Sequence, residues 1–369
     1  MKIAFVSAAQ SSHTVKWVNA LARKGHTVRL YSLPDHANRQ KSIDPAVETV
    51  LLRHPGFKGY FLNAGQLRRE IASFGPDIVN AHYASGYGTL ARLSHAHPLL
   101  LSVWGSDVYQ FPYRSALHRK LVADNIAGAD AVASTGYRMA EQVRRLFGDG
   151  NQIFITPFGV DCHTFSPLRK TKKGFTVGAV KALEPPYGLE DLIRAFHLFL
   201  RKLPPDAEAE LEIYGKGSLY GSLRQLIGDL GLDGKAFLRG AVPNADVPDA
   251  LHGMDVVCLP SLQESFGVSA VEAMACGIPV IASDADGFLE TVEDGVTGLI
   301  VPKNDPEAIA DRLYRLEQDA GLRKELGEAG RRRVLRLYDF DRNVEAMEKA
   351  YCAVVRKTRK AQPDGPSPE

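Results

Sequence analysis

Short apolar segments alternate with amphipathic segments along this chain, and the alternation occurs twice. The first series of strand-like segments lies at residues 2–7, 26–32, 77–82, 99–104, 130–135 and 153–159. The second series lies at residues 175–180, 210–215, 236–242, 255–261 and 279–283. Segments with apolar residues at helical spacing accompany them, such as 14–25, which ends at Gly25, and 188–203. Strands that alternate with helices are typical of parallel α/β sheets, so the sequence predicts two doubly wound domains.

The length of 369 residues also favours two domains, because a single hydrophobic core rarely grows beyond about 250–300 residues. We expect a first Rossmann-like domain at 1–165 and a second at 175–335. The linker predicted between them, 166–174, is polar and contains a proline and a basic cluster. A last amphipathic helix is predicted at 340–358, within a C-terminal segment 336–360, and the Pro-rich tail 361–369 is expected to be disordered.

Charge is divided unevenly along the chain, although the formal net charge is only +2. Residues 1–170 hold 20 Lys and Arg against 11 Asp and Glu, whereas residues 171–369 hold 25 against 32. A basic N-terminal half is typical of a protein that meets an anionic substrate or an anionic membrane surface. The alternative is a generally basic surface with no such partner. We expect peripheral contact with an anionic membrane and no nucleic-acid partner.

The four cysteines form no CxxC pattern, so neither a disulfide framework nor a zinc site is expected. Reduced thiols favour the cytoplasm. The N-terminus is typical of a β-strand and not of a signal peptide, and no apolar run approaches the length of a membrane span. The predicted localisation is cytoplasmic, with association at the inner face of the membrane.

Two short motifs suggest chemistry that their context does not favour. The stretch "YGKGSLYG" places Gly215, Gly217 and Gly221 after a predicted strand, but its G-x-G-x-x-x-G spacing differs from the dinucleotide fingerprint. A glycine-rich turn at a ligand cleft is the alternative. The stretch "DAD" (284–286) could hold a divalent metal, but no third ligand is visible, and helix capping or loop polarity is the alternative.

The stretch "LPSLQESFGVSAVEAMACG" carries two acids, Glu264 and Glu272, in an otherwise small and apolar context. It reads as a strand, a turn and a helix that ends near Gly277, with Ser265 expected as the N-cap. Backbone N–H groups near the helix start would belong to Phe266, Gly267 and Val268. Such a turn binds anions through its N–H groups and the helix dipole.

The two acids could also be a hydrolase pair, whose carboxyl groups lie about 5–9.5 Å apart. Eight residues of helix rise about 12 Å, so the pair suits two contacts along one extended ligand better. A diphosphate flanked by two hydroxyl-rich groups has that length.

With these motifs the sequence resembles retaining glycosyltransferases of family 4, which have the GT-B fold. The E-x7-E motif "ESFGVSAVE" is the main match, and "PFGVDCHTF" (157–165), "GLEDLIRAF", "GFLETV" (287–292) and "DGVTGLIVPKNDPEAIA" (294–310) accompany it. The resemblance covers nearly the whole chain. It implies two Rossmann-like domains that face each other across a cleft, with a nucleotide-sugar donor bound mainly by the second domain. It also implies that the final helix returns to the first domain.

The resemblance assigns roles to single residues of the second domain. Glu272 matches the acid that binds the nucleotide ribose, and Glu264 matches the acid that faces the transferred sugar. Lys181 stands where the family has a cation on the diphosphate. The backbone near Val242 would hold the base, and Gly215 lies in a turn expected beside the donor. Ser265 and the amides of the following turn would meet the diphosphate.

The sequence departs from the family pattern at three places. Pro186 and Tyr187 stand where a second lysine is common, and the first loop, "SAAQSSHT", has no glycine. Trp104 replaces a histidine in the loop after the fourth strand. We therefore assign contacts with donor or acceptor to His82 or Asp107 instead. The alternative for His82 is a histidine satisfied by local hydrogen bonds.

The expected function is a metal-independent, retaining transfer of sugar from a nucleotide sugar to a glycan or glycolipid. The donor is expected to be a UDP- or GDP-sugar, with no cofactor and no metal. Two alternatives stay open. One is a sugar-nucleotide epimerase on the same architecture, and the other is a non-catalytic nucleotide-sugar-binding protein.

Overall fold

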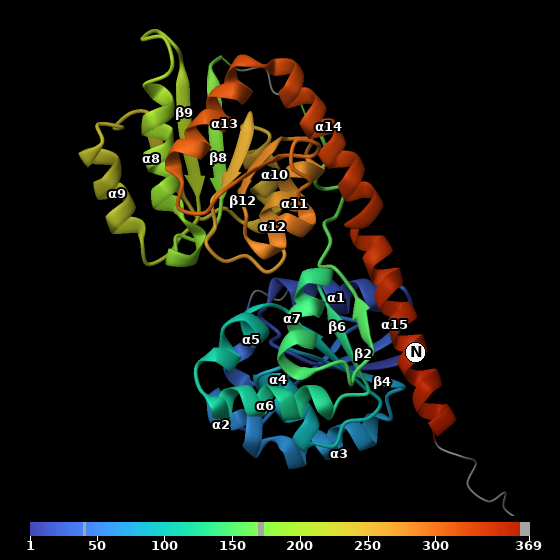
Figure 1. Ribbon diagram of the computed structural model, residues 1–369. Helices are drawn as coiled ribbons and strands as arrows, with labels where there is room; N and C mark the ends of the chain where they lie inside the picture. The colour runs from blue at the N-terminus through green and yellow to red at the C-terminus, as the bar shows by residue number, and fades with distance from the viewer. Residues whose placement is uncertain (40–41, 169–172, 362–369) are drawn as a thin grey trace, which may run out of the picture. The chain divides into compact units, whose positions relative to one another are not determined.

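The computed structural model describes residues 1–39, 42–168 and 173–361. The chain divides into two compact units (Figure 1). The first unit comprises Met1–Phe158 and the C-terminal segment from Asp341, and the second comprises Gly159–Phe340. The division therefore lies before the predicted linker. Residues 169–172 of that linker and residues 362–369 of the predicted tail lie outside the described residues.

A seven-stranded parallel sheet forms the centre of the first unit, with the strand order β3-β2-β1-β4-β5-β6-β7. Its strands are β1 (Lys2–Val6), β2 (Thr27–Ser32), β3 (Glu48–Leu51), β4 (Ile78–His82), β5 (Leu99–Val103), β6 (Ala131–Ser134) and β7 (Ile153–Ile155). β1, β4 and β5 are almost wholly buried, as expected for parallel strands covered on both faces. The register between β1 and β4 places Ile3 beside Ile78.

The helices of the first unit follow the strands in the expected alternation. They are α1 (Ser12–Arg23), α2 (Gly56–Leu62), α3 (Ala64–Phe74), α4 (Gly86–Leu93), α5 (Ser106–Tyr109), α6 (Ala116–Ala127) and α7 (Tyr137–Phe147), with short 3-10 turns η1 (Pro34–His36) and η2 (Phe111–Tyr113). Helices α2, α3, α4 and α6 gather on one face of the sheet (Figure 1).

The final helix, α15 (Phe340–Ala361), belongs to the first unit from Asp341 onward. Its Glu348 accepts hydrogen bonds from His26 Nε2 at 2.7 Å and Lys24 Nζ at 3.1 Å. The buried Tyr351 hydroxyl donates to Asn80 Oδ1 at 3.2 Å. The helix starts at Phe340, the start expected from the sequence, where Tyr338 and Phe340 exchange backbone hydrogen bonds with Val160.

A six-stranded parallel sheet forms the centre of the second unit, in the order β10-β9-β8-β11-β12-β13. Its strands are β8 (Phe175–Val180), β9 (Ala209–Tyr214), β10 (Ala236–Gly240), β11 (Val256–Leu259), β12 (Val280–Ser283) and β13 (Leu299–Val301). The helices are α8 (Leu189–Leu200), α9 (Tyr220–Asp229), α10 (Val247–Leu251), α11 (Val268–Ala275), α12 (Asp286–Thr291), α13 (Pro306–Gln318) and α14 (Ala320–Leu337), with 3-10 turns η3 (Pro185–Tyr187) and η4 (Asn244–Asp246).

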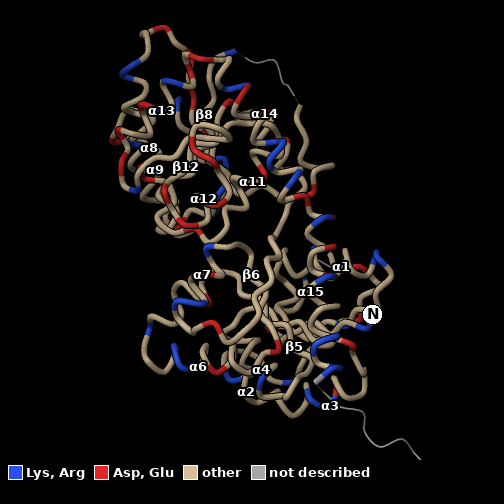
Figure 2. The backbone as a smooth tube through the Cα atoms, turned by 45° about the vertical axis from the view of Figure 1, so that its right-hand side comes forward, with Lys and Arg blue, Asp and Glu red and all other residues tan. Residues whose placement is uncertain are grey.

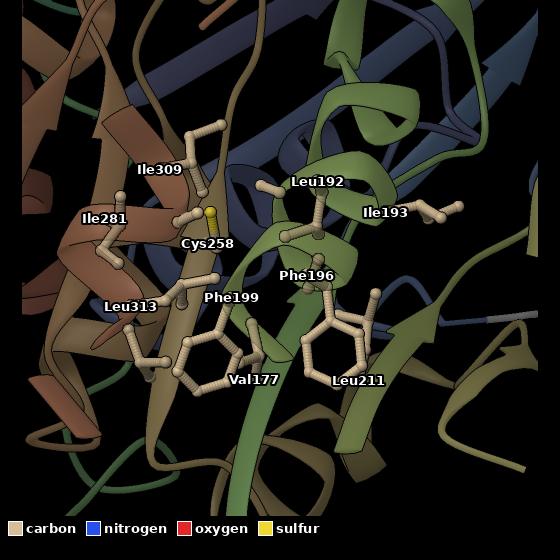
Figure 3. Close-up of a cluster of buried hydrophobic side chains, with 14 of the residues drawn as sticks. Val177, Leu192, Ile193, Phe196, Phe199, Leu211, Cys258, Ile281, Ile309 and Leu313 are labelled. Atoms are coloured by element: carbon tan, nitrogen blue, oxygen red, sulfur yellow. The ribbon is translucent and has the colours of Figure 1, made fainter. Parts of the chain in front are cut away.

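The core of the second unit packs α8 and α13 against the sheet (Figure 3). Phe196 and Phe199 of α8 are fully buried against Val177 and Leu313 and their neighbours. Full burial of one such side chain stabilises a fold by about 1.5–3 kcal/mol. Helices α8 and α9 lie on one side of the sheet, and α11 and α12 lie on the other (Figure 1).

Strand order changes direction once in each sheet. The change lies between β1 and β4 in the first unit and between β8 and β11 in the second. In open α/β sheets, ligands bind beside the carboxyl ends of the strands at this point. The loops after these four strands are therefore the places where site residues are expected. Among the described helices, none is both long and apolar enough to cross a membrane.

Candidate active site

The two loops at the switch point of the second unit bring a lysine and a glutamate together. Lys181 directly follows β8, and Glu264 lies in the loop between β11 and α11. Lys181 Nζ is 2.5 Å from Glu264 Oε2, and each side chain is only 11% exposed. The ammonium group also lies 4.4 Å from the ring centroid of Tyr187. The loops that carry Lys181 and Glu264 therefore meet at one place in the fold.

The turn after Glu264 leads directly into α11. The helix begins at Val268, and Gly267 is its N-cap, with φ of 91°. A Cβ at Gly267 would lie 2.8 Å from the ring of Phe288, so both the dihedral angle and the packing require glycine. Ser265 was predicted as the N-cap, and this is wrong because the helix starts two residues after the expected position.

Neighbouring elements fix this turn in place. Gly287 N–H donates to the Glu264 carbonyl at 3.0 Å, and the Ser269 hydroxyl donates to the Val180 carbonyl at 2.9 Å. The ring of Phe266 is buried and packs edge-on against Tyr338 at 5.5 Å. The first bonds within α11 run from Ala270 and Val271 to the Gly267 carbonyl. The amides of the preceding turn therefore form the positive end of the helix dipole.

Glu272 lies in the second turn of α11 and is half-buried. Only the residues from Val268 onward are helical, so the helix contributes about 6 Å of rise between Val268 and Glu272. The 12 Å rise of a continuous helix between the two acids therefore does not apply, because the residues before Val268 are not helical. Glu264 lies before the amide turn and Glu272 after it, so the turn separates them.

The predicted residues Gly215 and Val242 lie in loops at the same edge of the sheet. Gly215 follows β9, and a Cβ there would lie 1.8 Å from the Lys181 carbonyl. Gly217 is similarly close to the Leu183 carbonyl. These glycines let the two loops pack together, which explains the "YGKGSLYG" stretch without a dinucleotide fingerprint. Val242 follows β10 and is half-buried.

The "DAD" stretch has loop partners of its own. Asp284 accepts the Lys303 N–H at 3.1 Å, and Asp286 begins α12. Within residues 1–39, 42–168 and 173–361, no group of three or more His, Cys, Asp or Glu side chains has a geometry suited to a metal ion.

His82 of the first unit is fully buried at the end of β4. Its Nε2 is 2.9 Å from Asn80 Oδ1, which can only accept, so Nε2 donates and Nδ1 accepts from Ser7 Oγ at 3.1 Å. Burial, with a smaller effect of His13, lowers the pKa of His82 to about 3. Both ring nitrogens are bonded inside the protein. His82 therefore fits the alternative of a histidine satisfied by local hydrogen bonds, and not the predicted contact with donor or acceptor.

Asp107 likewise contacts the protein itself and does not fit the predicted contact with donor or acceptor. Its carboxylate is buried and accepts backbone hydrogen bonds from Ala84 at 2.8 Å, Gly105 at 2.7 Å and Trp104 at 3.1 Å. Burial raises the pKa of Asp107, while these amide hydrogen bonds act in the opposite direction. The side chain therefore joins the loops after β4 and β5 and supports their shape.

Trp104 and several aromatic residues that the sequence did not single out lie at the switch point of the first unit. The ring centroid of Trp104 lies 4.4 Å from that of His82 and 5.4 Å from that of Phe158. His13 stacks on Phe158 at 4.0 Å, and burial, with a smaller effect of Lys16, lowers the pKa of His13 to about 4. Tyr83, which packs against Trp104, and Tyr60 come from "HYASGYG" and "GFKGYFL", and the density of aromatic residues in these stretches was the available sequence signal.

Comparison with known proteins agrees with this architecture. The family model described as "Glycosyl transferase 4-like" matches residues 2–136, and the model "Glycosyl transferases group 1" matches residues 163–333. The D-inositol 3-phosphate glycosyltransferase of Salinispora arenicola is 29% identical over 322 residues, which cover 78% of this chain and 71% of that protein.

Solved structures show the same fold at low identity. Sucrose-phosphate synthase from Thermosynechococcus elongatus gives a TM-score of 0.83 at 21% identity, over 98% of this chain and 100% of that one. HepE of Anabaena, solved in complex with UDP, gives 0.79 at 19% identity, over 96% and 100%. Together with the family models, these matches identify the chain as a family 4-like glycosyltransferase of the GT-B fold.

Proposed function

We propose that this glycosyltransferase moves a hexosyl group, with retention and without a metal, from a UDP- or GDP-sugar to a glycan or glycolipid acceptor. The observation that carries the proposal is the position of Lys181, which lies 2.5 Å from Glu264 at the switch point beside the start of α11. These groups supply a cation, a carboxylate and a helix N-terminus at one place. A cation and a helix N-terminus suit a diphosphate, and a carboxylate suits the hydroxyl groups of a sugar.

Negative charge develops on the leaving diphosphate as the glycosidic bond breaks. Lys181 and the amides at the start of α11 stabilise this charge in our account. A helix N-terminus contributes up to about 2 kcal/mol in a partly buried site, and a charge-assisted hydrogen bond about 1.5–3 kcal/mol. Donors that are already in place before the reaction are usually the largest catalytic contribution. For this to happen, the diphosphate must replace Glu264 as the partner of Lys181.

Glu264 then faces the transferred sugar, and Glu272 binds the ribose hydroxyls on the other side of the amide turn. The acceptor hydroxyl attacks the anomeric carbon from the side of the leaving group, and the departing phosphate takes its proton. This sequence retains the anomeric configuration without a covalent sugar–enzyme intermediate. Trapping of such an intermediate would contradict the retaining step as proposed.

UDP is the first nucleotide to test, because the structurally similar HepE was solved with UDP. We propose that the acceptor binds to the first unit, and that this unit meets the inner face of the membrane. The excess of Lys and Arg over Asp and Glu in residues 1–170 supports this placement.

The decisive experiment measures release of nucleoside diphosphate from UDP-, GDP- and ADP-sugars by the wild-type protein and by Lys181→Met. The matched control is Lys202→Met. Lys202 lies just after α8 and forms an exposed ion pair with Asp311 of α13, at 2.8 Å. We expect turnover that persists in EDTA, is lost in Lys181→Met and is kept in Lys202→Met. Conversion of the donor to an epimer, or saturable donor binding without any turnover, would overturn the proposal.

A further inference from the structure

A cavity of about 350 Å³ opens at the carboxyl edge of the sheet in the first unit, beside the switch point between β1 and β4. Aromatic side chains dominate its wall. They come from α2, from the loops after β4 and β5, from α4 and from η2, namely Phe57, Tyr60, Phe61, Tyr83, Tyr87, Trp104 and Phe111. A volume of this size is in the range of small-molecule binding sites.

The polar groups that line this cavity are largely engaged with the protein. Ser7 bonds to Thr14 at 2.7 Å as well as to His82. The Tyr87 hydroxyl lies 2.8 Å from His36 Nδ1 and accepts the Leu33 N–H at 3.2 Å. No Lys, Arg, Asp or Glu is among the described residues of the wall. A small phosphorylated polyol would need cations and free hydrogen-bonding groups here, whereas an apolar chain needs neither.

Large apolar side chains on two helices that contribute to the cavity wall, α2 and α6, face the solvent. Phe57 is 66% exposed and Phe61 is 40% exposed, one turn apart on α2. Leu62 follows on the same helix at 59%. On α6, Leu117 is 75% exposed and lies one turn before Leu121 of the cavity wall. An exposed apolar surface of this kind beside an apolar cavity marks an interaction site.

Basic residues accompany this apolar rim. Lys58 lies between the two exposed phenylalanines of α2, and Arg119 and Lys120 lie on α6. No Asp or Glu occurs in residues 53–69 or 108–123, but Asp124 pairs with Lys120 at 3.0 Å, and Asp35 accepts the Gly56 N–H at 3.1 Å. Lys and Arg are also visible along α6 and beside α3 (Figure 2). A surface that combines exposed aromatics with an excess of cations over acids complements an anionic lipid surface.

We propose that the α2–α6 rim docks onto an anionic membrane, and that the aromatic cavity receives the apolar chain of a lipid-linked acceptor. This inference rests on the proposed function, because it defines the chemical class of the acceptor. The rim residues Phe57, Phe61, Leu62 and Leu117 enter the lipid interface, and the cations hold the surface there. The acceptor headgroup then lies at the carboxyl edge of the sheet.

Vesicle flotation of the full-length protein tests the docking. We expect flotation with vesicles of phosphatidylcholine and phosphatidylglycerol, but not with phosphatidylcholine alone. Leu62→Ser/Leu117→Ser should lower the floated fraction about tenfold. The matched control, Leu335→Ser/Leu337→Ser, removes two exposed leucines of α14 in the second unit and should float like the wild type. Wild-type flotation of the rim variant, or no preference for anionic vesicles, would overturn the docking.

Tryptophan fluorescence tests the cavity itself, because the chain has two tryptophans and only Trp104 lines the cavity. Octyl glucoside, below its micelle concentration, should shift the emission of the wild type but not of Trp104→Phe. Methyl glucoside, which has the same sugar and no chain, should give no shift. An equal emission shift with methyl glucoside would show that the cavity binds the sugar and not the apolar chain, and would refute the inference.

Failure of this inference can be told apart from failure of the proposed function. Thermal stabilisation by UDP-sugars reports the donor site of the second unit, and the rim variants should keep it. If donor binding and turnover persist while flotation and the octyl glucoside response are absent, only the lipid inference is wrong. Self-association through the rim, in place of vesicle binding, would likewise overturn it in favour of a protein interface.

Discussion

Lys181→Met separates the structural role of the Lys181–Glu264 pair from its catalytic role. Methionine keeps the length of the side chain and its packing against Tyr187, but it removes the charge that lies 2.5 Å from Glu264. Glu264 is then left without its cation at a position where it is 11% exposed. The variant should therefore lose both folding stability and activity, for two different reasons.

The size of each loss follows from the geometry. A largely buried polar group that loses its partner costs about 1–3 kcal/mol. In a unit of this size that corresponds to a fall in Tm of roughly 3–10 °C. Loss of one charge-assisted hydrogen bond to the diphosphate costs about 1.5–3 kcal/mol in the transition state, which is about 10- to 150-fold in kcat/KM.

The double variant Lys181→Met/Glu264→Gln distinguishes the two losses. Without the carboxylate no unpaired charge remains, so most of the stability should return. Activity should stay at least as low as in Lys181→Met, because the cation for the diphosphate is still absent. Tm from thermal unfolding and kcat/KM from nucleotide release provide the two readouts. Wild-type kcat/KM in Lys181→Met, or recovery of activity together with stability in the double variant, would refute the catalytic role.

Three further predictions concern residues at the switch points of the two units. Glu264→Gln should reduce kcat far more than donor affinity, whereas Glu272→Gln should mainly weaken donor binding. Kinetics measure kcat, and separate titrations measure donor affinity. Equal effects of each variant on kcat and on donor affinity would argue against the assigned roles. Gly267→Ala should lower the free energy of unfolding by more than the roughly 1–2 kcal/mol expected for the left-handed backbone, because its Cβ would lie 2.8 Å from a ring carbon of Phe288 in α12. Gly277→Ala is the control, because Gly277 also has positive φ but its Cβ would make only ordinary contacts. Chemical unfolding should show the smaller loss of stability for Gly277→Ala. The pKa of His82, lowered to about 3, means that the unfolded chain binds more protons than the folded chain between about pH 3 and 6.5, so stability falls as pH decreases through that window. From pH 7.5 to 5 the loss should be about 2 kcal/mol larger in the wild type than in His82→Gln, and parallel unfolding curves for the two proteins would contradict this assignment.

The sequence predicted the strands and helices of the second unit well, because these elements depend on local patterns. The strand and helix around Glu264 have strong periodicity, and the switch point follows from parallel strand order. The position of the helix start was missed by two residues, because Gly267 tolerates the left-handed conformation that packing against α12 requires. Sequence alone shows that glycine is present, but not which dihedral angle the neighbouring helix imposes.

Side chains of the first unit were harder to predict, because their roles depend on contacts between distant segments. His82 and Asp107 were chosen for their places at strand ends. Ser7, 75 residues away from His82, and Ala84, 23 residues away from Asp107, satisfy them in the fold. The aromatic cavity likewise joins side chains from α2, α4 and η2, which no single motif contains.

Hydrogen exchange with and without saturating UDP tests the central claim, that the donor binds at the switch point of the second unit. We expect slower exchange in peptides that cover the loop around Lys181 and the turn from Glu264 to Val268. Exchange in α2 of the first unit should be unchanged by UDP alone. Protection confined to the first unit, or unchanged exchange around Lys181 and Gly267 while UDP is bound, would contradict donor binding at this switch point.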